Sequence, residues 1–183
     1  FSESVFAAST APAKTTGLKT LFDQEVEVRA PRDNFFHCLV NAAHQFHNRE
    51  NEEDRYLLAG YPWFKVRARD QFIAMPGCSL AIGQPQLFES LAQTAMAASR
   101  SFMDGLPNSV ISELDAPDAL LWLVWALQQY NEQIPRGDLY DEMAQFVVQA
   151  VHFIANQQHP HVYMQQDGLL YVDGTHVPMT WMN

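Results

Sequence analysis

Apolar residues recur at the spacing of an α-helix along most of this 183-residue chain. Pro85 suits the first turn of a helix, whereas Pro76 should kink or end the helix that contains it. The pattern predicts helices over residues 34–48, 69–81, 85–103, 117–130 and 139–156. Helices of this length, joined by short loops, are typical of helical hairpins that stack side by side. The fold class that we expect is therefore all-α.

Short strands are expected at two places. Residues 25–30 read EVEVRA, and this alternation of polar and apolar residues predicts a short strand. Near the C-terminus, Val162–Met164 and residues 169–172 flank a Gln-Asp-Gly turn at residues 166–168, which predicts a β-hairpin.

The bulk composition indicates a folded domain that does not bind nucleic acid. Hydrophobic residues make up 48% of the chain and charged residues 17%, which allows a sizeable core. The net charge of −10 disfavours polyanionic partners, because binding to phosphates depends on Lys and Arg. A neutral partner would not be repelled by this charge.

Several features suggest a cytoplasmic protein without a membrane partner. No apolar run reaches about 18 residues, and the first residues do not resemble a signal peptide. Cys38 and Cys78 have no disulfide-like spacing and are expected to be reduced thiols. We expect residues 1–30 to form a lead-in or linker segment and residues 31–183 to form one domain.

The densest cluster of chemically informative residues lies at residues 61–77, which read YPWFKVRARDQFIAMPG. Tyr61 and Trp63 offer flat aromatic faces to a ligand, although such residues can also belong to a core. The fork of Arg69 donates hydrogen bonds and the adjacent Asp70 accepts them, so together they could hold two neighbouring hydroxyl groups. The alternative is that Asp70 stabilises the start of a helix while Arg69 is solvated.

This segment is similar to the start of the catalytic domain in the glycogen debranching, amylo-α-1,6-glucosidase family, which reads close to Y-P-W-F-x-x-x-x-R-D-x-x-I-A-L-P-G. The resemblance extends from about residue 57 to the end. Three later motifs keep the family's order: GLPN at residues 105–108, DALLW at 118–122, and DGLLY at 167–171 followed by TWMN at 180–183.

The resemblance implies a glycoside hydrolase that acts, by inversion, on α-1,6-linked glucose at the branch points of glycogen or another α-glucan. It also implies an α/α toroid of six helical hairpins. Because the predicted helices are too few for that ring, we expect a partial toroid, the N-terminal part of the catalytic domain, which would be inactive in isolation. The resemblance calls for no cofactor, and the histidines lack zinc-like spacing, so no metal is expected. The sequence does not determine the oligomeric state.

The resemblance also assigns roles to individual residues. Asp118 would lie at the active-site end of its helix, although on spacing alone it could simply start that helix. Asn108 would lie near the pocket, although an Asn there also suits a plain turn. Trp122 and Trp125 are three apart on one helix, which is more typical of a core than of a sugar site. The expected substrate-binding residues are Arg69, Asp70, Trp63, Tyr61, Asn108, Asp118, Trp122 and Trp181.

Two departures from the family pattern leave other functions open. Glycoside hydrolysis needs two carboxyl groups, yet Asn183 stands where the family has its catalytic acid, and an amide cannot protonate a leaving oxygen. The second carboxylate is expected beyond this chain. The family's W-G-R-D reads Arg67-Ala68-Arg69-Asp70 here. The alternatives are a non-catalytic glucan-binding module, a glucoamylase-like or trehalase-like hydrolase, and a helical scaffold whose aromatic residues are all core.

Overall fold

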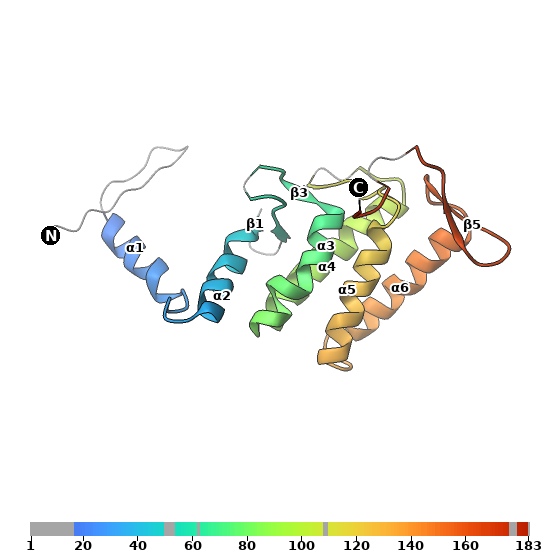
Figure 1. Ribbon diagram of the computed structural model, residues 1–183. Coiled ribbons are helices and arrows are strands. Elements are labelled where there is room, and N and C mark those ends of the chain that lie inside the picture. Colours follow the sequence, from blue (N-terminus) through green and yellow to red (C-terminus); the bar gives the residue numbers. More distant parts are fainter. Residues whose placement is uncertain (1–16, 50–53, 62, 108–109, 176–178, 183) are drawn as a thin grey trace. The chain divides into compact units, whose positions relative to one another are not determined.

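The part of the protein that the structure describes is mostly helical, as predicted, with three short pairs of strands (Figure 1). The computed structural model describes residues 17–49, 54–61, 63–107, 110–175 and 179–182. The chain divides into two compact units, residues 1–42 and 43–183, which are described separately. The predicted boundary between residues 30 and 31 stays a prediction.

The first unit contains α1, Leu18–Glu27, and most of α2, Phe35–Phe46. The predicted strand at residues 25–30 is wrong, because α1 continues to Glu27. Leu18, Phe22 and Val26 recur every four residues, and this helical period overrides the local alternation. The side chain of Asn41 then ties the connecting segment to α2, donating to the Ala30 carbonyl at 2.8 Å and accepting from the Ala30 N–H at 3.1 Å.

Four long helices form the second unit: α3 is Ala68–Cys78, α4 is Pro85–Met103, α5 is Ala119–Gln133 and α6 is Tyr140–Ala155. α3 packs on α5, α4 packs on α3 and α5, and α6 packs on α4 and α5 (Figure 1). This arrangement confirms the predicted helices, and the closure of a toroid stays a prediction. Pro76 does not end α3, which continues to Cys78 before a 3₁₀ turn at Leu80–Ile82.

Strand pairs brace the ends of these helices. β1, His47–Arg49, pairs antiparallel with β2, Arg55–Leu57, and this pairing ends α2 earlier than predicted. β5, Val162–Met164, pairs antiparallel with β6, Leu170–Val172, as the hairpin prediction expected. β3, Val66–Arg67, pairs in parallel with β4, Ile111–Ser112, and neither strand was expected from the sequence.

The parallel pair determines where the helices begin. β3 runs directly into α3, and β4 precedes α5 by a short turn. The hydroxyl of Ser112 also donates to the carbonyl of Val66 at 2.9 Å. Because the two strands point the same way, α3 and α5 start at the same end of the unit.

Tyr130 joins α5 to α4 in the middle of the core. Its ring is fully buried and stacks on Phe88 with centroids 5.1 Å apart and planes 9° apart. Its hydroxyl donates to Glu89 at 2.6 Å. Burial, followed by the contact with Glu89, raises the pKa of Tyr130 above its usual value of about 10.

This environment predicts that the protein loses stability at alkaline pH. The native state resists ionisation of Tyr130, whereas the unfolded chain ionises near pH 10, so the free energy of unfolding should be maximal below about pH 10 and fall as the pH rises. Tyr130→Phe should lower the free energy of unfolding at pH 7 by about 1–2 kcal/mol and flatten its decline above pH 10. Urea unfolding at several pH values measures both effects.

Tyr171→Phe is the matched control, because that ring is exposed. It should change the free energy of unfolding by less than about 0.5 kcal/mol. An alkaline decline as steep in Tyr130→Phe as in the wild type would contradict the assignment to Tyr130.

Candidate functional site

An ion pair joins the two helices that start at the same end. Arg69 lies in the first turn of α3 and Asp118 stands at the N-cap position of α5. Arg69 Nε donates to Asp118 Oδ1 at 2.7 Å, and the two side chains are only 8% and 15% exposed. The pairing of β3 with β4 therefore brings together residues that are 49 positions apart.

The other oxygen of Asp118 organises two tryptophans. Asp118 Oδ2 accepts from Trp122 Nε1 at 3.1 Å and from the main-chain N–H of Trp181 at 3.1 Å. Although Asp118 occupies the N-cap position, its side chain makes no capping hydrogen bond to α5. Its carboxylate thus links α3, α5 and the C-terminal segment.

A pocket of about 390 Å³ lies against this carboxylate. Its wall is mostly apolar and combines one face of α5 with the C-terminal segment; it consists of Asp118, Leu121, Trp122, Trp125, Thr180, Trp181 and Met182. The rings of Trp122 and Trp125 meet edge to face, with centroids 5.5 Å apart. Trp122 packs partly against the core, and Trp125 is 36% exposed. Both side chains line the pocket.

Sequence reasoning missed part of this wall. Leu121 and Trp125 stand three and seven residues after Asp118, which places all three on one face of a helix. That spacing could have identified them. Thr180 and Met182 carry no such signal, because the C-terminal segment has no regular period.

Asp70 lies apart from Asp118, which is the partner of Arg69 in the ion pair. It is exposed and lines a different pocket of about 220 Å³, beside Gln71 and Ala74. Consecutive residues of a helix point about 100° apart, which explains the separation. The structure thus pairs Arg69 with Asp118, and the joint clamp of Arg69 and Asp70 stays a prediction.

The aromatic turn before β3 carries Tyr61, Trp63 and Phe64, whose side chains are exposed and line neither of these pockets. Trp63 is 79% exposed, which contradicts the alternative that it belongs to the core. Tyr61 is half exposed and its ring meets Phe46 edge to face at 6.3 Å. Gly60 has a φ of +48°, and a Cβ there would lie 2.3 Å from the ring of Phe64, so this turn favours glycine.

Arg67 and Ala68, which stand where the family pattern has Trp and Gly, make specific contacts in the structure. Arg67 pairs with Glu113 at 3.3 Å and lies over the ring of Phe64 at 5.3 Å. Ala68 is fully buried at the start of α3. These contacts connect the aromatic turn to the strand pair that positions the Asp118 pocket.

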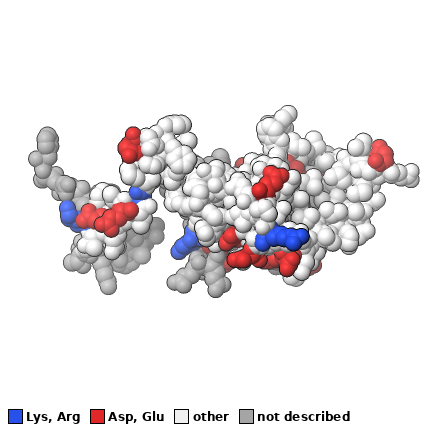
Figure 2. Space-filling model, turned by 90° about the horizontal axis from the view of Figure 1, so that it is seen from below, with Lys and Arg blue, Asp and Glu red and all other residues white. Residues whose placement is uncertain are grey.

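Acidic groups are frequent on the face drawn in Figure 2, and the basic side chains visible there occur in small groups. This distribution agrees with the net charge of −10. The predicted site residues Asn108 and Asn183 lie outside the described residues. Within the described ranges, His, Cys, Asp and Glu form no group of three that could hold a metal ion.

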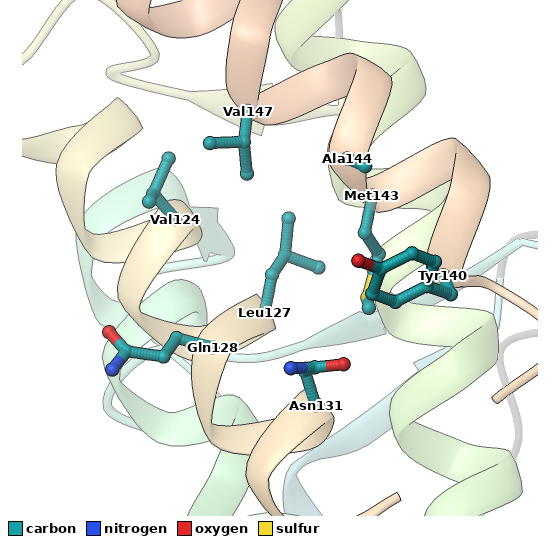
Figure 3. A pocket seen from close by; sticks show the side chains of 8 residues that line it. All are labelled: Val124, Leu127, Gln128, Asn131, Tyr140, Met143, Ala144 and Val147. Atoms are coloured by element: carbon teal, nitrogen blue, oxygen red, sulfur yellow. The ribbon is translucent and has the colours of Figure 1, made fainter. Parts of the chain in front are cut away.

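A second apolar groove, of about 360 Å³, lies between α5 and α6 (Figure 3). Leu127 and Met143 point into it from opposite helices, and Tyr140 borders it (Figure 3). No helix in the described part of the chain has the length and apolar character that crossing a membrane requires.

A protein-family model described as amylo-alpha-1,6-glucosidase matches residues 40–183. The chain belongs to the amylo-alpha-1,6-glucosidase family. The match includes helices α3 to α6, the aromatic turn and the Asp118 pocket. Comparisons with curated proteins and with solved structures found no match.

The Arg69–Asp118 pair should couple strongly, because both side chains are largely shielded from water. Arg69→Met leaves the carboxylate of Asp118 uncompensated and should lower the free energy of unfolding by about 3–5 kcal/mol. In a double-mutant cycle with Asp118→Asn, measured by urea unfolding, the coupling energy should be about 1–3 kcal/mol.

The pair Arg100–Glu142 serves as a control, since it also joins two helices at 2.9 Å but is 29% and 39% exposed. The same cycle with Arg100→Met and Glu142→Gln should give less than about 1 kcal/mol. Equal coupling energies for the two pairs would show that burial of the Arg69–Asp118 pair is unimportant.

Proposed function

We propose that this chain supplies the sugar-binding part of a glycoside hydrolase that acts on α-1,6-linked glucose at the branch points of glycogen or another α-glucan. The observation that carries the proposal is the Asp118 pocket, where a carboxylate held by Arg69 lies among three tryptophans. Membership of the amylo-alpha-1,6-glucosidase family supports the reaction class.

The pocket has the properties that a glucose residue requires. The apolar C–H faces of a sugar ring pack against aromatic surfaces, and Trp125 and Trp181 offer such surfaces with 36% and 61% exposure. Asp118 positions this wall through its bonds to Trp122 and Trp181.

The same geometry argues against catalysis by Asp118 itself. Hydrolysis requires one carboxyl group to protonate the leaving oxygen and another to activate water. Among the described residues that line this pocket, Asp118 is the one with a carboxylate. That carboxylate already accepts hydrogen bonds from Arg69, Trp122 and Trp181. We infer that Asp118 is a positioning residue and that the acid and base lie elsewhere.

The 183-residue chain should therefore bind maltooligosaccharides without releasing glucose. Since three of its four tryptophans line the pocket, binding should change the tryptophan fluorescence. Trp125→Ala should weaken binding at least about fivefold, the equivalent of about 1 kcal/mol, because a stacking surface is lost. Titration by fluorescence measures the affinity, and a glucose assay measures hydrolysis.

Tyr171→Ala is the control variant, since it removes an exposed aromatic ring on β6 that does not line the pocket. Glucose release by the 183-residue chain would show that it holds a complete catalytic pair. Absence of any binding would instead favour a helical scaffold.

A second candidate function is a glucan-binding module without catalytic activity, and the amide at position 183 favours it. The two functions are separated by Asn183→Asp, assayed in the natural full-length protein. If Asn183 occupies the position of the acid, the substitution should create or raise 1,6-glucosidase activity, because general acid catalysis contributes about 10²–10⁴-fold. The near-equal size of the two side chains should leave packing unchanged.

Three outcomes are informative. A gain of activity supports the hydrolase scaffold with a missing acid. Normal wild-type activity that declines with the aspartate would mean that another residue is the acid. Activity in neither form, with maltooligosaccharide binding retained in both, would favour the binding module.

A further inference from the structure

One histidine joins the first strand pair to the end of α3, and both belong to the second compact unit. His47 lies in β1, and its Nε2 lies 2.9 Å from the main-chain oxygen of Cys78, the last residue of α3. Because a carbonyl oxygen only accepts hydrogen bonds, Nε2 must carry the hydrogen and donate it. The last carbonyl groups of a helix have no partner within it, so His47 caps the end of α3.

The surroundings of the other ring nitrogen of His47 suit only the neutral ring. Since Nε2 holds the hydrogen, Nδ1 of the neutral ring carries a lone pair. Nδ1 is shielded from solvent and has no hydrogen-bond partner in the described part of the chain. A proton on Nδ1 would therefore create a buried donor without an acceptor, on a ring that also gains a positive charge.

The charged groups around His47 disfavour this proton as well. Arg55 on β2, and His44 on α2 when it is protonated, act on the ring with positive charge. The ring of His44 lies 6.1 Å from that of His47 between centroids. Arg49 on β1 acts in the same way on Arg55. On α3, burial raises the pKa of the Cys78 thiol, so that side chain adds no charge at neutral pH.

These surroundings make the attachment of β1 to α3 sensitive to acid. Burial lowers the pKa of His47 below its ordinary value of 6.5, and the charges of His44 and Arg55 lower it further, although the hydrogen bond to Cys78 acts in the opposite direction. When β1 leaves α3, the ring returns to water and recovers its ordinary pKa. The detached form then binds the proton more strongly, so attachment is complete above about pH 7 and weakens as the pH falls through about 6.5.

We propose that His47 is an acid-sensitive switch, which releases the β1–β2 strand pair from the end of α3 when its ring takes up a proton. The strand pair also braces the body of α3, because the main-chain N–H of Leu57 in β2 donates to Gln71 Oε1 on that helix at 3.0 Å. The first turn of the same helix carries Arg69, which holds Asp118. The switch depends on contacts within the chain and is independent of what the Asp118 pocket binds.

The experiment is amide hydrogen exchange of the ¹⁵N-labelled 183-residue chain, followed by NMR at about pH 7.5 and about pH 5.5 and corrected for intrinsic exchange rates. The amides of Leu57 and Leu58 report on the strand pair, since they donate to Gln71 and to the carbonyl of Phe46. We expect their protection factors to be about fivefold to tenfold lower at the acidic pH. A free imidazole is about tenfold more often protonated than neutral there, which sets the upper limit.

His47→Gln separates the switch from a general effect of acid. The glutamine amide can still donate to the carbonyl of Cys78 but takes up no proton, so the protection factors should change by less than about twofold between the two pH values. His152→Gln is the matched control, because His152 is an exposed histidine in the last turn of α6. This variant should keep the full decline of the wild type. Circular dichroism checks that each variant is folded.

A direct titration keeps the proposal testable even if His47→Gln does not fold. The ring resonances of His47 in the wild-type chain should titrate with a midpoint below about pH 6.5, and a midpoint at or above that value would overturn the proposal. A decline in protection as large in folded His47→Gln as in the wild type would overturn it as well. The amide of Leu123, in the core of α5, should stay at least about tenfold more protected than that of Leu57 at the acidic pH. Equal protection would contradict a local release, because the whole unit would then be unfolding.

Discussion

A shielded ion pair between the starts of α3 and α5 holds the candidate site together. Arg69 and Asp118 would each carry an uncompensated and largely buried charge without the other. The pairing of β3 with β4 brings their helices to the same end, and the remaining oxygen of Asp118 then fixes two tryptophans. The position of the pocket thus follows from one carboxylate and its three donors.

The helices could be predicted because their signal is local. α4 runs from Pro85 to Met103, as the apolar spacing and the N-terminal proline indicated. The β5–β6 hairpin could also be predicted, since two short strand-like segments flank its Gln-Asp-Gly turn. α1 was misjudged, because a six-residue window of alternation concealed a longer helical period. A local sequence pattern was therefore a reliable predictor where the stretch of sequence considered covered the whole helix or hairpin.

The candidate site was only partly predictable, because its contacts are not local. β3 and β4 have two residues each, too few for any period, and they pair across more than forty positions. Sequence proximity suggested that Arg69 acts with Asp70. In the structure Arg69 pairs with Asp118 while Asp70 lines another pocket, and the joint clamp stays a prediction. Family motifs identified Arg69, Asp118, Trp122 and Trp181 individually. That they are linked through Asp118 became visible only in the structure.

The bond between Asp118 and the main chain at Trp181 has a consequence for the order of assembly. Arg69 and Asp118 are 49 positions apart, and Trp181 follows Asp118 by another 63. As a ribosome releases the chain from its N-terminus, the ion pair can form well before the last wall of the pocket exists. A partly synthesised chain would hold the charge pair and the face of α5 but an open pocket. Closing that long loop carries an entropic cost of its own, which the contacts of this wall must offset.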